Sequence, residues 1–171
     1  MLNNLPLHAL IVHMPIALTV LVPLFMVVAF ALGRKQLTPL LAWAVPVGLL
    51  ALQLATGVMA DKTGEQQEDR VENVVPPNAL EEHEEAAELF LVVTAAVLVI
   101  SAGGLMNNTV GAAMRAAALA GSIAVLAAGW NVGHSGGSLV YRYNAGAVYS
   151  RAPQGSGATS TRPHPAPSDD H

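Results

Sequence analysis

Four of the six histidines lie near the ends of long apolar segments, and all four fall on one side if each segment crosses a membrane. They are His8 and His13 at the start of the first segment, His83 at the start of the third and His134 at the end of the fourth. Imidazole is well suited to bind haem iron or a transition-metal ion, and the polar groups that a membrane protein retains near its core tend to be functional. The histidines therefore indicate a haem- or metal-binding site at one end of a membrane bundle.

The elements that must position these histidines are four uncharged stretches, each longer than the roughly 20 residues that cross ~30 Å of hydrocarbon as a helix. These stretches run over residues 1–33, 36–60, 89–114 and 116–141, and together with local helix-start and helix-stop signals they predict spans at about 8–33, 38–60, 83–106 and 112–135. Only 12% of all residues are charged, against about 25% in soluble domains. The expected fold is all-α, an integral membrane four-helix bundle within residues 1–149. Residues 150–171 are rich in Ser, Gly, Pro and Thr and predict a disordered C-terminal tail.

The charges are strongly segregated along the chain. Ten of the twelve acidic residues lie between Asp61 and Glu88, in and beside an expected acidic loop at 61–82. Basic residues favour the cytoplasmic side of a bilayer. Three of the eight basic residues, Arg34, Lys35 and Arg115, lie in the short loops at the opposite end of the expected bundle, whereas Arg142, Arg151 and Arg162 in the C-terminal segment weaken this bias. The acidic loop and both termini are therefore predicted to be periplasmic.

Several functions are disfavoured by composition. The chain has no cysteine, which excludes disulfides, thiolate metal sites, iron–sulfur clusters and covalent c-type haem attachment. It has no basic stripe for nucleic acid. No nucleophile–base pair or phosphate-binding loop is present, so the sequence leans against an enzyme.

Five further residues could complete a haem site. Phe90 and Trp130 could pack on the porphyrin, and Gly133 and Gly136 would permit close approach of a flat cofactor. Asp61 could orient an imidazole through its second ring nitrogen. A structural interpretation of the same residues stays open, because glycines near residue 136 could end the fourth helix and Asp61 could be an ordinary helix-end carboxylate.

Only one of the two N-terminal histidines, His8 or His13, is expected to face the bundle interior. They are five residues apart, about 140° around an ideal helix, so both cannot face the interior of one straight helix. The strongest ligand candidates are His13, which lies deeper, together with His83 and His134, and His8 ranks fourth. Pro15 leaves two interpretations open: one helix with a kink, or a helix that begins near His13.

The run LHALIVHMPIAL at residues 7–18 resembles the opening motif of a bacterial four-helix membrane family catalogued as domain of unknown function 2231. A second motif, GHSGGSLVY at residues 133–141, also fits, and the similarity covers about residues 6–146. The chain departs from the pattern at Met14, where an aromatic residue is usual, and at Lys62, where a tryptophan is expected. The resemblance implies a bacterial inner-membrane protein whose histidines are suspected of binding haem or metal, without an established activity.

Three functions compete. The first is electron transfer or redox sensing with b-type haem held between imidazoles of different helices. The second is a transport or accessory protein that binds a transition-metal ion through three imidazoles and Asp61, with the acidic loop attracting cations. The third is a structural subunit without a cofactor. The expected partner is the lipid bilayer, no nucleic acid is expected, and a redox partner protein and a homo-oligomer are left open.

Overall fold

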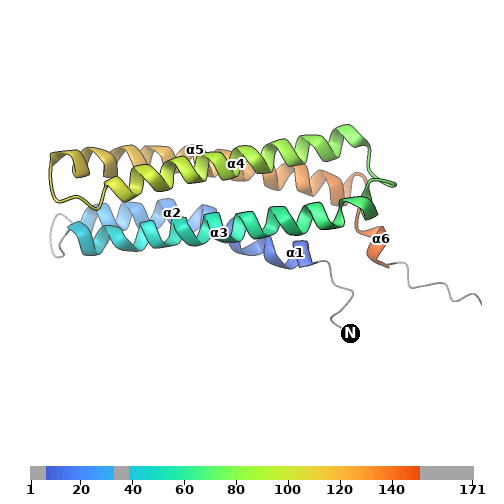
Figure 1. The fold of residues 1–171 in the computed structure, drawn as a ribbon, viewed down its shortest axis with the longest axis horizontal. Helices are drawn as coiled ribbons and strands as arrows, with labels where there is room; N and C mark the ends of the chain where they lie inside the picture. The colour runs from blue at the N-terminus through green and yellow to red at the C-terminus, as the bar shows by residue number, and fades with distance from the viewer. Residues whose placement is uncertain (1–6, 33–38, 151–171) are drawn as a thin grey trace, which may run out of the picture.

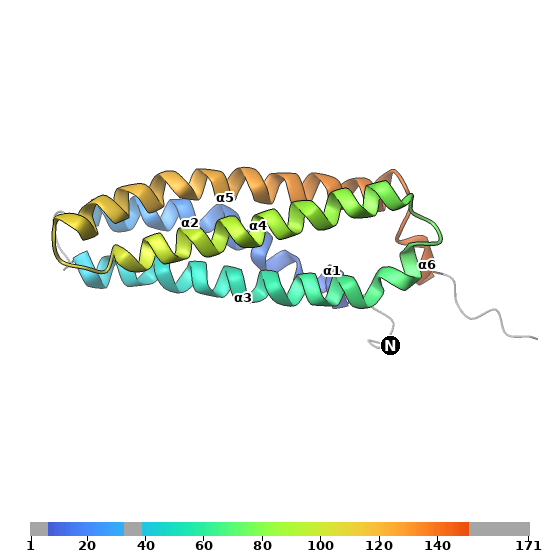
Figure 2. The same cartoon turned by 45° about the horizontal axis from the view of Figure 1, so that its top comes forward.

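The computed structural model describes residues 7–32 and 39–150, which form one elongated helical bundle (Figure 1). Four long helices make up the bundle and two short ones lie at one end of it (Figures 1 and 2). In chain order the helices are α1 (Leu7–Ile11), α2 (His13–Leu32), α3 (Pro39–Val71), α4 (Pro77–Gly103), α5 (Thr109–Tyr141) and α6 (Ala147–Ser150). Among the described residues, four helical segments are long and apolar enough to cross a membrane. The prediction of an all-α four-helix membrane bundle is confirmed.

The helices continue beyond the predicted spans at the end that carries the acidic residues, which we call the acidic end. The segment predicted as an acidic loop is mostly helical, because α3 continues to Val71 and α4 already begins at Pro77. Helix α5 runs through Gly136 and Gly137 to Tyr141, so the prediction that it ends at these glycines is wrong. Charged residues end a hydrocarbon-spanning segment, but Glu, Gln, Lys and Ala are good helix formers and let the helix itself continue.

A break near residue 12 separates α1 from α2. The segment therefore has a feature of each interpretation: it is helical before Pro15, and its long helix begins at His13. Helix α2 begins at His13, as one of them required, and a short helix precedes it. Pro15 has no backbone N–H to donate to the carbonyl of Ile11, so the regular hydrogen-bond ladder is interrupted there. The carbonyl of Val12 still accepts from the N–H of Ile16 at 3.2 Å, which starts the new helix.

The bundle has two hydrophobic clusters. The larger lies along the four long helices and includes Trp43 and Phe90. A smaller one, which we call the end cluster, joins the α3–α4 turn to the end of α5 and consists of Val75, Ala79, Leu139 and Ala145. Helices α2 and α3 pack as one hairpin and α4 and α5 as another, and these two pairs make the most extensive contacts.

The charged part of α4, from Pro77 to Glu88, corresponds to about 16 Å of helix. Large apolar side chains are exposed along the rest of the bundle, as expected where they face lipid. The acidic end is therefore a helical projection beyond the apolar part, with the end cluster as its own small core. The predicted disordered tail, apart from Ser150, and the basic loop that carries Arg34 and Lys35 lie outside the described residues.

Candidate histidine site at the acidic end

The four described histidines separate into two pairs by exposure. His8 and His83 are half-buried, whereas His13 and His134 are exposed. The structure thus reverses the expected order of the N-terminal pair. Because the chain breaks between α1 and α2, His8 turns toward the bundle and His13 points away from it.

His8 is fixed against α3. Its Nδ1 lies 2.7 Å from the carbonyl oxygen of Ala60. A carbonyl can only accept a hydrogen bond, so Nδ1 carries the proton and donates, which leaves a lone pair on Nε2. The ring also packs on Gly64, where an added Cβ would lie 3.3 Å from both Cε1 and Nδ1 of His8. The absence of a side chain on Gly64 lets α1 approach α3.

His83 is held by α5 in a similar way. Its Nδ1 lies 2.9 Å from Oγ of Ser135. The Ser135 hydroxyl donates its own hydrogen to the carbonyl of Val132 at 3.1 Å, so Oγ is left to accept from Nδ1–H. His83 therefore also carries its proton on Nδ1 and has a lone pair on Nε2. Gly136 leaves room for the ring, since a Cβ there would lie 3.0 Å from Cε1 of His83.

Asp61 belongs to the same neighbourhood. It is half-buried on α3, one residue after the carbonyl that holds His8. His83 interacts electrostatically with both His8 and Asp61, although these three residues come from α1, α3 and α4. Within the described residues, no group of three or more His, Asp or Glu side chains is close enough together to hold a metal ion.

The other residues considered for a cofactor lie in different surroundings. Phe90 is buried at 6% exposure between two glycines, Gly57 on α3 and Gly129 on α5. Trp130 is 78% exposed, and a Cβ added to Gly133 would meet nothing within 4 Å. Of the five predicted cofactor-binding residues, Gly136 lies against the His83 ring and Asp61 interacts electrostatically with His83.

Sequence reasoning missed three residues that position the imidazoles: Ala60, Gly64 and Ser135. Ser135 follows His134 directly in the motif at residues 133–141 and has a hydroxyl that could bond an imidazole, which was a usable signal. The other two were not recognisable, because Ala60 acts through its backbone carbonyl and Gly64 through the lack of a side chain.

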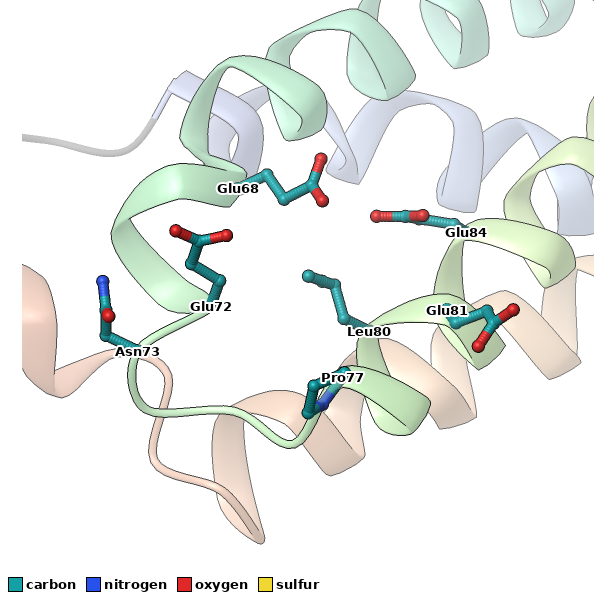
Figure 3. Close-up of a pocket in the computed structure, with 7 residues that line it drawn as sticks. All are labelled: Glu68, Glu72, Asn73, Pro77, Leu80, Glu81 and Glu84. Carbon is teal, nitrogen blue, oxygen red and sulfur yellow. The ribbon is translucent and has the colours of Figure 1, made fainter.

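A cleft of about 470 Å³ lies beside this site, between the end of α3 and the start of α4 (Figure 3). In Figure 3 the carboxylates of Glu68 and Glu84 point toward each other across it. It is lined by Glu68, Glu72, Asn73, Pro77, Leu80, Glu81 and Glu84. Four carboxylates around one cleft attract cations electrostatically.

The contact between Gly136 and His83 gives a direct test of this geometry. In Gly136→Ala the new methyl group should displace the His83 ring and disturb its hydrogen bond to Ser135. Gly137→Ala is the matched control, because a Cβ there would meet nothing within 4 Å. NMR spectra of histidine-labelled protein should show a changed His83 imidazole signal in the first variant only. An unchanged signal in Gly136→Ala would contradict the placement of His83 against α5.

The apolar bundle and its polar, histidine-bearing end define a multi-pass integral membrane protein. The chain belongs to the family described as "Predicted membrane protein (DUF2231)", whose model matches residues 4–148. The resemblance inferred from the N-terminal and C-terminal histidine motifs is thus confirmed. No curated protein and no solved structure matches the chain significantly.

Proposed function

We propose that the protein binds b-type haem through His8 and His83 and acts in membrane electron transfer or redox sensing. The observation that carries this proposal is the hydrogen bonding that His8 and His83 share. Each donates Nδ1–H to an oxygen of a neighbouring helix, Ala60 O or Ser135 Oγ, and keeps the lone pair of Nε2. Metal-bound histidines are oriented in the same way, with the second ring nitrogen donating to a carbonyl or another polar oxygen.

The number of ligands favours haem over a bare ion. A porphyrin supplies four nitrogens, so two imidazoles complete the coordination of its iron. A zinc or similar ion needs three or four protein ligands, and the described residues contain no such group. Haem, when bound, would supply a reversible one-electron couple. The chain's own part is to hold the two imidazoles in one tautomer, with Asp61 nearby to stabilise positive charge.

The position of the site also suits electron exchange at the membrane surface. His83 lies within the charged part of α4, and His8 is bonded to Ala60 on α3, next to Asp61, where the apolar segment of that helix ends. A protein that docks at this acidic end would need a basic surface. Trp130, Gly133 and His134 contribute nothing to this proposal, because they lie on exposed parts of α5.

One observation favours the alternative of a transition-metal ion, namely the cleft with four carboxylates beside the histidines. An absorption spectrum and a metal analysis of one purified sample distinguish the haem function from the metal-ion function. Protein purified in detergent from cells supplied with haem should show a low-spin b-type spectrum, with a sharp α band after reduction. A colourless protein that carries stoichiometric zinc, copper or iron would support the metal-ion function, and a colourless protein without metal would reject both.

We also propose that the acidic end and both termini face the periplasm of the bacterial inner membrane. Because the chain has no cysteine, single cysteines can report the topology. Asn73 and Asn107 lie in exposed turns at opposite ends of α4. In spheroplasts, a membrane-impermeant maleimide should label Asn73→Cys and not Asn107→Cys. The opposite result would reverse the orientation, and equal labelling would contradict a membrane-spanning α4.

A further inference from the structure

The middle of the membrane-spanning core contains polar side chains that the histidine site does not use. They are Thr19 on α2, Gln53 on α3 and Thr94 on α4, and all three are buried. Gln53 and Thr94 have 0% exposure. Within hydrocarbon, a polar group without a hydrogen-bond partner is strongly unfavourable, because no bulk water can replace the missing bond.

Only part of this polar group is satisfied by protein. Gln53 donates from Nε2 to Oγ1 of Thr19 at 2.9 Å, and Thr19 donates onward to the carbonyl of Pro15 at 2.7 Å. Oε1 of Gln53 and Oγ1 of Thr94 have no hydrogen-bond partner among the described residues. One is an acceptor, and the other can both donate and accept.

The two unpaired atoms belong to residues at the same height of the bundle. Gly57 on α3 faces Phe90 and Leu91 on α4, and Trp43 on α3 donates to the carbonyl of Ser101 on α4 at 2.9 Å. Helices α3 and α4 are antiparallel (Figure 2). Gln53 is one turn from Gly57 and Thr94 is one turn from Phe90, so both lie between these two contacts. Each also lies on the buried stripe of its helix, Gln53 in line with Leu50 and Ala60 and Thr94 in line with Phe90 and Val97, so both face the bundle interior.

We propose that Gln53 and Thr94 bind one water molecule between the two hairpins, in the middle of the membrane. A water molecule can donate to Oε1 of Gln53 and exchange a hydrogen bond with the hydroxyl of Thr94, which satisfies both atoms together. Buried waters typically bridge polar groups in this way. The site offers neutral oxygens and no carboxylate, so it does not compensate for the dehydration of a cation. This inference is independent of the proposed haem function.

The test combines a stability cycle with direct observation. Thr94→Val has nearly the same shape as wild type but lacks the hydroxyl, so it should lower the melting temperature in detergent. Thr94→Ser keeps the hydroxyl and should stay closer to wild type. In the double variant Gln53→Leu/Thr94→Val both side chains are apolar. Its decrease in melting temperature should therefore be smaller than the sum of the decreases in Gln53→Leu and Thr94→Val. Ser122→Ala is the control, because the Ser122 hydroxyl bonds within its own helix, to the carbonyl of Leu119.

A high-resolution experimental structure should show one density peak within hydrogen-bonding distance of both atoms, and Thr94→Val should weaken or remove it. A direct bond between Gln53 and Thr94, without such a peak, would overturn the proposal. Strict additivity of the two substitutions would also overturn it. If sodium or potassium raised the melting temperature of wild type but not that of Gln53→Leu, the site would bind a cation, and the water proposal would be overturned.

Discussion

His83→Ala is expected to abolish the low-spin haem spectrum, and His8→Ala is expected to do the same or to leave a high-spin form. Each substitution removes one of the two imidazoles that face the bundle with a free Nε2. Loss of an axial ligand changes the spin state of haem iron or releases the haem. The measurement is the reduced-minus-oxidised absorption spectrum of protein purified from cells supplied with haem.

The matched controls are His13→Ala and His134→Ala. Both remove a histidine at the same end of the bundle, but both side chains are exposed, so the spectrum should stay as in wild type. The sequence alone ranks these two residues above His8, which makes the comparison decisive. Loss of haem in either control, with retention in His8→Ala, would show that the ligands lie outside the bundle interior.

Gly111→Ala should destabilise the protein more than any other glycine-to-alanine substitution considered above. Gly111 lies in the first turn of α5, where its N–H donates to the side chain of Asn108 at 2.8 Å. An added Cβ would overlap the backbone carbonyl of Met106, and a backbone atom in a tight turn cannot move aside as a flexible side chain can. We expect a loss of about 3 kcal/mol, or roughly 6–12 °C in melting temperature.

Gly48→Ala is the control for this substitution. Gly48 lies within α3, and a Cβ there would meet nothing within 4 Å. Alanine favours a helix over glycine by up to about 1 kcal/mol, so this variant should be as stable as wild type or slightly more stable. Equal melting temperatures for Gly48→Ala and Gly111→Ala would contradict the close packing of the α4–α5 turn.

The four-helix fold could be predicted because it depends on a robust property, the lack of charge over more than 20 residues. The helix ends could not be predicted in the same way. The charges after Asp61 mark where the apolar segment ends, but the residues that carry them continue the helix as far as Val71. The same holds for α5, where Gly136 was interpreted as a helix end and instead makes room for His83.

The histidine site was only partly visible in the sequence. The general location at one end of the bundle follows from counting spans. The direction in which each histidine points does not follow from this count. The helix is interrupted at Val12, and this interruption changes the angle around the helix axis between His8 and His13. Small and apolar residues occur on all faces of α5, so its sequence does not show which of the two neighbours, His134 or Ser135, faces inward. Gln53 and Thr94 are visible as polar residues in apolar stretches, but only the fold brings them to one height.

The two hydrophobic clusters differ greatly in size, and this divides the molecule into two units of unequal stability. The cluster along the long helices has eleven buried members, whereas the end cluster has four, two of them alanines. Burial of so little apolar surface holds the end of α3, the start of α4 and the end of α5 together against the mutual repulsion of the carboxylates on α3 and α4. The acidic end can therefore open as a local cooperative unit while the membrane-spanning part stays folded. Such opening would admit a large flat ligand to His83 without unfolding the bundle.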